Sequence, residues 1–136
     1  MNKHQQLVEN FMKVMEQDTP IAFSPKNYPA ALRASLILEE ANEFLVASQS
    51  SDFVSMIDAI CDLLYVTYGA AVAMGIDIEP FFEEVHRSNM SKLDPETNLP
   101  VRREDGKILK PPTYSPADIK SLLLRLHAIP LFAQVE

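Results

Sequence analysis

The stretch FVSMIDAICDLLYVTYGAAVAM, residues 53–74, constrains the fold more than any other part of the chain. Wound as a helix, it carries apolar side chains on nearly every side, and such a helix normally lies in the interior of a protein. Asp58 and Asp62 fall on the edge of its main apolar stripe. An ionised carboxylate in an interior is costly unless it has a partner. The stretch therefore predicts an interior helix with two acidic side chains that need something to bind.

The two aspartates interrupt the longest apolar run, so the sequence predicts no membrane-spanning segment. Cys61, between them, is the single cysteine of the chain, which excludes an internal disulfide and a cysteine-rich zinc site. We expect a buried structural thiol there. Residues 1–10 lack the apolar core of a secretory signal, which predicts a soluble, cytoplasmic protein.

A second acidic cluster lies on the helix expected over 29–47, in the letters LEEANEF. Glu39 and Glu43 fall on one face at helical spacing, with Glu40 beside them. A solvated acidic edge accounts for many such clusters, and spacing alone weighs the two interpretations about equally. Two clusters on neighbouring, largely apolar helices favour a divalent-cation site. Carboxylates suit Mg²⁺, with Mn²⁺ as an alternative, better than zinc, and the predicted ligands are Glu39, Glu40, Glu43, Asp58 and Asp62.

The rest of the chain predicts an all-α protein, because glycine is scarce and Leu, Ala, Met, Glu and Lys are common. Further helices are expected at 3–18, from about 77 or 79 to 93, and at 116–129, where Ser115 would cap and Pro116 would open the helix. Residues 94–114 read as an irregular loop with a small hairpin around Asp105-Gly106. We expect one domain over 1–136, with its core at about 29–93. The net charge of −7 disfavours nucleic-acid binding through a broad basic surface.

The letters EEANE, DAICDLLYVTYG and EVHRSNMSKL, in this order and spacing, resemble the all-α nucleoside triphosphate pyrophosphohydrolases. This superfamily includes MazG-type proteins, dimeric dUTPases and phosphoribosyl-ATP pyrophosphohydrolase. VHRSNMSK and the later DGKILKPPTYSPADI are most similar to its MazG-like, phosphoribosyl-ATP-hydrolase-like branch, some of whose members act on dUTP. The resemblance covers about residues 30–120. It implies a four- to five-helix bundle completed by oligomerisation, as a homodimer or homotetramer, and Mg²⁺-dependent cleavage between the α and β phosphates.

The same resemblance assigns roles to particular residues. Members bind metal through an E-E-x-x-E helix and an E-x-x-D helix, which makes Glu39, Glu40, Glu43 and Asp62 the expected catalytic and metal-binding set. Ala59 stands where the pattern has glutamate, and Asp58 is its expected substitute, so the number of metal ions is left open.

Substrate-binding side chains are expected in the segment after these helices. The resemblance implies that Asn89 and Lys92, which share a helix face, hold phosphate oxygens or a base edge. Lys107 and Lys110 lie in the irregular segment, where they either close over the triphosphate or serve as ordinary loop lysines.

The sequence therefore predicts a Mg²⁺-dependent pyrophosphohydrolase that converts a (d)NTP, such as dUTP or a noncanonical nucleotide, to the monophosphate and pyrophosphate. One alternative is the phosphoribosyl-ATP pyrophosphohydrolase of histidine synthesis. Another is a non-catalytic helical oligomer that binds metal and nucleotide. No nucleic-acid or membrane partner is expected.

Overall fold

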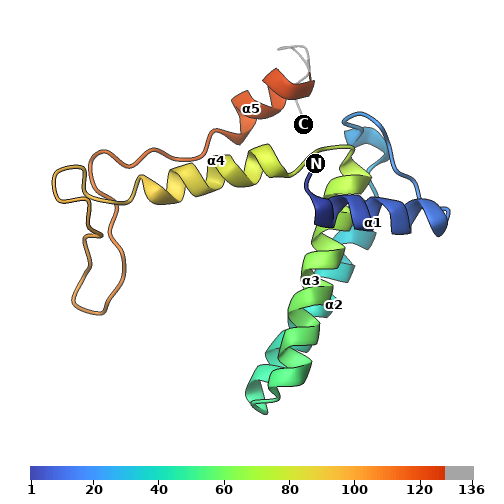
Figure 1. Ribbon diagram of the computed structural model, residues 1–136, viewed down its shortest axis with the longest axis horizontal. Helices are drawn as coiled ribbons and strands as arrows, with labels where there is room; N and C mark the ends of the chain where they lie inside the picture. The colour runs from blue at the N-terminus through green and yellow to red at the C-terminus, as the bar shows by residue number, and fades with distance from the viewer. Residues whose placement is uncertain (128–136) are drawn as a thin grey trace. The chain divides into compact units, whose positions relative to one another are not determined.

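In a computed structural model of the protein, which describes residues 1–127, the chain is all α-helical, as predicted (Figure 1). Within these residues the isolated bridges form no named strand. The contacts divide the chain into two compact units, with the boundary in the sequence between Ile78 and Glu79, and each unit is described by itself. The prediction of one domain over 1–136 stays a prediction. The elements are α1 (Lys3–Val14), a short 3-10 helix (Pro25–Asn27), α2 (Ala30–Gln49), α3 (Phe53–Met74), α4 (Glu79–Met90) and α5 (Ile119–His127).

The two ends of α3 lie where the sequence places them. The Asp52 carboxylate accepts the Ser55 N–H at 3.1 Å, which satisfies one of the free donors of the first turn. At the other end Gly75 takes the left-handed conformation, with φ 72°, that commonly stops a helix.

Other helix ends differ from the prediction. Helix α1 ends at Val14 rather than at residue 18, and the chain leaves it through Glu16, which has a positive φ of 56°. Helix α5 starts at Ile119 rather than at residue 116, because Asp118 is its cap and accepts the Ser121 N–H at 2.9 Å. Its predicted end at 129 lies outside the described residues.

In the first unit, α2 and α3 pack side by side and α1 crosses α3 (Figure 1). The core lies where α1 meets the C-terminal half of α3, around Val8, Met12, Val72 and Ala73. The fully buried Gln5 side chain donates to the Ile76 carbonyl at 2.7 Å and accepts the Ile78 N–H at 3.1 Å. These bonds fix the end of α3 against α1 and leave the neighbouring backbone groups satisfied.

Helix α3 is less covered in the single chain than its sequence predicts. Its residues from Gly69 to Ala73 are buried, but Ile57 is 62 % exposed, since α2 covers one face and α1 only one end. Cys61 is exposed as well, so the expectation of a buried thiol is wrong for the single chain. By length and composition α3 is also the one helix among residues 1–127 that could cross a membrane, because its two aspartates are too few to offset its hydropathy.

In the second unit, α4 and α5 are joined by a long irregular segment. The predicted hairpin at Asp105-Gly106 is present in minimal form, as one bridge between Arg102 and Ile108. The ring of Phe81 on α4, which is 5 % exposed, stacks against the ring of His127 on α5, and this contact ties the two helices together.

Candidate functional site

The packing of α2 on α3 sets the predicted carboxylates against each other. A Cβ on Gly69 would lie 3.1 Å from Nη1 of Arg33, so the two helices approach closely at this pair. Helices α2 and α3 run antiparallel and are joined by the turn at residues 50–52. Seven residues closer to this turn lie Glu40 on α2, counted from Arg33, and Asp62 on α3, counted from Gly69. Because seven residues are close to two turns, Glu40 on α2 lies opposite Asp62 on α3.

The electrostatics of Glu40 confirm that the acidic side chains are near one another. Partial burial raises the pKa of Glu40, and the charges of Glu43, Asp62, Glu39 and Asp58 raise it further. These are the five residues predicted as metal ligands. Glu40 is half-buried and the other four are exposed, which leaves them free to reorient.

Within residues 1–127, no three His, Cys, Asp or Glu side chains are arranged to hold a metal ion in the positions that they occupy here. The donor set nevertheless fits a hard divalent cation, because it consists of carboxylate oxygens and because a cation would relieve the repulsion that raises the pKa of Glu40. The five-residue metal site therefore stays a prediction. Ala59 is 2 % exposed, so the position where the pattern has glutamate faces into the packed interface between helices.

An open cleft adjoins these carboxylates at the end of the α2–α3 hairpin. Glu43 and Asp58 face it from the two helices, together with Asn42 and Ser55. Polar groups from both helices thus line a cleft that solvent can enter.

Arg33 is a buried cation that the sequence analysis missed. It is 7 % exposed, and its Nη2 donates to Gln17 Oε1 at 3.4 Å and lies 4.0 Å from the sulfur of Met12. Its Nε has no hydrogen-bond partner in the described part of the chain. The guanidinium thereby joins α2 to the end of α1. An arginine in the first turn of α2 gave no sequence signal that distinguishes it from a surface residue.

In the second unit the structure brings three of the predicted substrate-binding residues together. Lys92 Nζ donates to Asn89 Oδ1 at 2.9 Å, and Lys110 Nζ lies 4.6 Å from the centre of the Tyr114 ring. A hydrogen bond with the hydroxyl of Ser88, and then the charges of Lys110 and Lys92, lower the pKa of the Tyr114 phenol. Asn89, Lys92, Lys110 and Tyr114 form what we call the cationic cluster.

The fourth predicted residue, Lys107, lies in the turn of the minimal hairpin, where its N–H donates to Asp105 Oδ1 at 3.1 Å. Tyr114 was not predicted. Its place near Lys92 depends on how the irregular segment returns to α4, which no local pattern encodes.

Comparison with known proteins supports the resemblance noted from the motifs. A family model described as phosphoribosyl-ATP pyrophosphohydrolase matches residues 8–89. The matched region contains α2, α3 and all five predicted metal ligands, and it ends in α4 at Asn89. No curated protein matches the chain.

Proposed function

We propose that this chain, which belongs to the phosphoribosyl-ATP pyrophosphohydrolase family, hydrolyses the bond between the α and β phosphates of phosphoribosyl-ATP. Enzymes of this family are pyrophosphohydrolases and are generally Mg²⁺-dependent. The observation that carries the proposal is the match over residues 8–89, which includes the helix pair on which five carboxylates act on one another.

In this proposal the carboxylates of α2 and α3 hold the cation. Its five ligands are Glu39, Glu40, Glu43, Asp58 and Asp62. When bound, the cation would neutralise phosphate charge and lower the pKa of a water molecule bound to it. Glu43 also lines the open cleft, which supports the proposal that its carboxylate accepts a hydrogen bond from the attacking water and orients it.

In this proposal the cationic cluster of the second unit is a further group of phosphate-binding residues. Lys92 and Lys110 carry positive charge, and the Asn89 amide and the Tyr114 phenol can donate hydrogen bonds to phosphate oxygens. Bound to a phosphate group of the substrate, these groups would neutralise part of its negative charge.

A second substrate class has its own support. The family match ends at Asn89, inside the segment VHRSNMSK and before DGKILKPPTYSPADI, and both segments resemble the MazG-like, phosphoribosyl-ATP-hydrolase-like branch, some of whose members act on dUTP. A nucleoside triphosphate such as dUTP is therefore the alternative substrate. The match itself favours phosphoribosyl-ATP.

The experiment is a substrate panel. Purified protein is incubated with phosphoribosyl-ATP, dUTP and the common triphosphates, with Mg²⁺, Mn²⁺ or a chelator, and pyrophosphate release is measured. We expect metal-dependent release that is fastest with phosphoribosyl-ATP and that Asp62→Asn abolishes. Glu83→Gln, which removes an exposed charge on α4, is the matched control and should keep full activity. Absence of release from every substrate would leave only the non-catalytic oligomer.

We also propose that the chain functions in the cytoplasm as a homodimer or homotetramer. Family membership supports this, since the family is one of soluble metabolic enzymes. Helix α3 supports it too, because Phe53, Val54 and Ile57 are each more than half exposed in the single chain. Light scattering on purified protein should give a multiple of the 15.3 kDa chain mass, and a monomer would contradict the proposal.

A further inference from the structure

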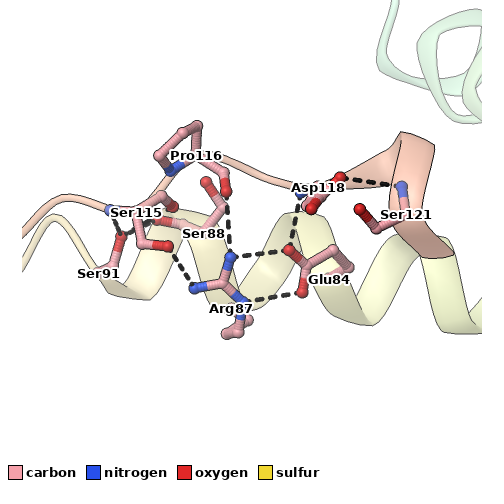
Figure 2. A network of polar contacts seen from close by, with 8 residues as sticks. All are labelled: Glu84, Arg87, Ser88, Ser91, Ser115, Pro116, Asp118 and Ser121. Carbon is pink, nitrogen blue, oxygen red and sulfur yellow. Dashed lines mark hydrogen bonds and ion pairs between the residues drawn. The ribbon is translucent and has the colours of Figure 1, made fainter.

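Arg87 on α4 holds a distant part of the chain. Its Nε and Nη2 donate to the two carboxylate oxygens of Glu84 at 2.8 and 2.7 Å, in a bidentate ion pair. The same guanidinium donates from Nη1 to Ser115 Oγ at 3.1 Å and from Nη2 to the Pro116 carbonyl at 3.2 Å (Figure 2). One side chain thus joins α4 to residues that follow it by 28 and 29 positions.

Two further contacts reinforce this junction. Ser91 Oγ accepts the Ser115 N–H at 2.9 Å and lies 3.3 Å from the Ser115 carbonyl. Glu84 Oε1 accepts the Asp118 N–H at 2.9 Å (Figure 2). We call this set of contacts between α4 and residues 115–118 the α4 clasp. Hydrogen bonds from Arg87 and from the Asp118 N–H lower the pKa of Glu84 to about 2, so the carboxylate stays ionised at neutral pH.

The α4 clasp closes a long loop. Lys92 directly follows Ser91, and Tyr114 directly precedes Ser115. Because Ser91 and Ser115 are hydrogen-bonded, the two ends of the segment 92–114 are held together. Closing a loop of this length has an entropic cost that the clasp contacts offset. In the closed loop Lys110 lies over the Tyr114 ring, and the Tyr114 phenol lies near Lys92 and bonds with Ser88 on α4.

We propose that Arg87 is a positioning residue, which through the α4 clasp assembles the cationic cluster into a binding site for a phosphate group of the substrate. The inference rests on the proposed function for the identity of that substrate. Four of the five N–H donors of Arg87 bond to Glu84, Ser115 and Pro116, so in this proposal it acts on phosphate through Lys110 and Tyr114 rather than by contact.

The first test is kinetic. Arg87→Gln removes the clasp contacts to Ser115 and Pro116 and leaves those of Ser91 and Glu84 in place. We expect KM to rise about tenfold with kcat nearly unchanged, because loss of about one charged hydrogen bond makes loop closure less favourable by that factor. Arg103→Gln is the matched control: it removes the same charge and an ion pair with Asp105 inside the loop, but no clasp contact. KM should be unchanged in this control.

A double-mutant cycle shows whether Arg87 acts through Lys110. Lys110→Ala alone should also raise KM, and Arg87→Gln should add little to it, because both substitutions remove the same binding group. Fully additive effects on KM, or an unchanged KM in Arg87→Gln, would overturn the positioning role while leaving the pyrophosphohydrolase activity in place.

The second test needs no turnover, so it separates this inference from the proposed function. In a tyrosinate absorbance titration the wild type should show one phenol, absent in Tyr114→Phe, that ionises below the ordinary value of about 10. In Arg87→Gln its pKa should move up toward that value. Ser115→Ala, which deletes one acceptor of Arg87, should move it in the same direction and replaces Arg87→Gln if that variant does not fold. A Tyr114 pKa that both substitutions leave unchanged would refute the clasp.

Discussion

Replacing Gly75 by alanine should destabilise the first unit strongly, whereas the same change at Gly106 should have a small effect. Both glycines have a positive φ, 72° and 84°, which an alanine adopts at a cost of about 1–2 kcal/mol. Their surroundings differ. An alanine Cβ at Gly75 would lie 2.1 Å from the Ala22 carbonyl oxygen, while at Gly106 no atom lies within 4 Å.

The difference in stability follows from what must move. The backbone at Ala22 has to retreat by about an ångström, and the hydrogen bond from the Ser24 N–H to the Met74 carbonyl, at 2.9 Å, holds that segment in place. Losing this bond adds about 1 kcal/mol to the conformational cost. We therefore expect a loss of about 2–3 kcal/mol for Gly75→Ala and about 1–2 kcal/mol for Gly106→Ala. At roughly 4 °C per kcal/mol, these losses lower the melting temperature by about 8–12 and 4–8 °C.

Thermal and urea unfolding followed by far-UV circular dichroism, in metal-free buffer, measure both variants against the wild type. Separate transitions of the two units would be fitted separately, since Gly75 belongs to the first unit and Gly106 to the second. A loss for Gly75→Ala no larger than that for Gly106→Ala would show that the close approach to Ala22 is wrong.

Three further predictions test the site and its supports. The folded-state pKa of Glu84 is lowered from 4.5 to about 2, so its contribution to stability should be present above pH 4.5 and lost between about pH 4.5 and 2. NMR titration of the Glu84 carboxyl carbon should show this low pKa, and a value near 4.5 would contradict the prediction. Because the folded-state pKa of Glu40 is raised, its ionisation lowers stability as the pH rises through that pKa, so Glu40→Gln should melt higher than wild type at neutral pH without metal. Mg²⁺ at a hundredfold excess over Kd should raise the wild-type melting temperature, measured by scanning calorimetry, by about 10 °C and that of Glu40→Gln by much less. Equal rises in the two proteins would show that Glu40 is not part of the site. Gly69→Ala, whose Cβ would lie 3.1 Å from the movable end of the Arg33 side chain, should cost about 1 kcal/mol or less by urea unfolding, and a loss as large as that of Gly75→Ala would show that Arg33 cannot shift.

The parts of the fold that the sequence predicted correctly depend on local chemistry. Helix α3 spans the predicted residues 53–74, because the Asp52 cap and the left-handed Gly75 each act within one turn of a helix end. Helical spacing predicts that Glu39 and Glu43 lie beside Glu40 on α2, and both charges raise the pKa of Glu40. The effect of Asp62 depends on how α2 packs on α3, and the metal site stays a prediction.

The parts that the sequence did not predict depend on contacts between distant residues. Burial of Arg33 requires contacts with Met12, Gln17 and Gly69, which lie far from it in the sequence. The exposure of Cys61 follows from which face of α3 stays uncovered in the single chain. The α4 clasp joins Arg87 to Ser115 across 28 positions, and no periodicity in the sequence encodes that pairing. Tyr114 was missed for the same reason.

Calorimetric titration of the metal-free protein with Mg²⁺ and Mn²⁺ tests most directly whether α2 and α3 form a divalent-cation site. We expect saturable uptake by the wild type, strongly reduced uptake by Asp62→Asn and by Glu40→Gln, and wild-type uptake by the control Glu83→Gln. Titration that shows no uptake by the wild type, with or without a non-hydrolysable nucleotide analogue, would contradict it.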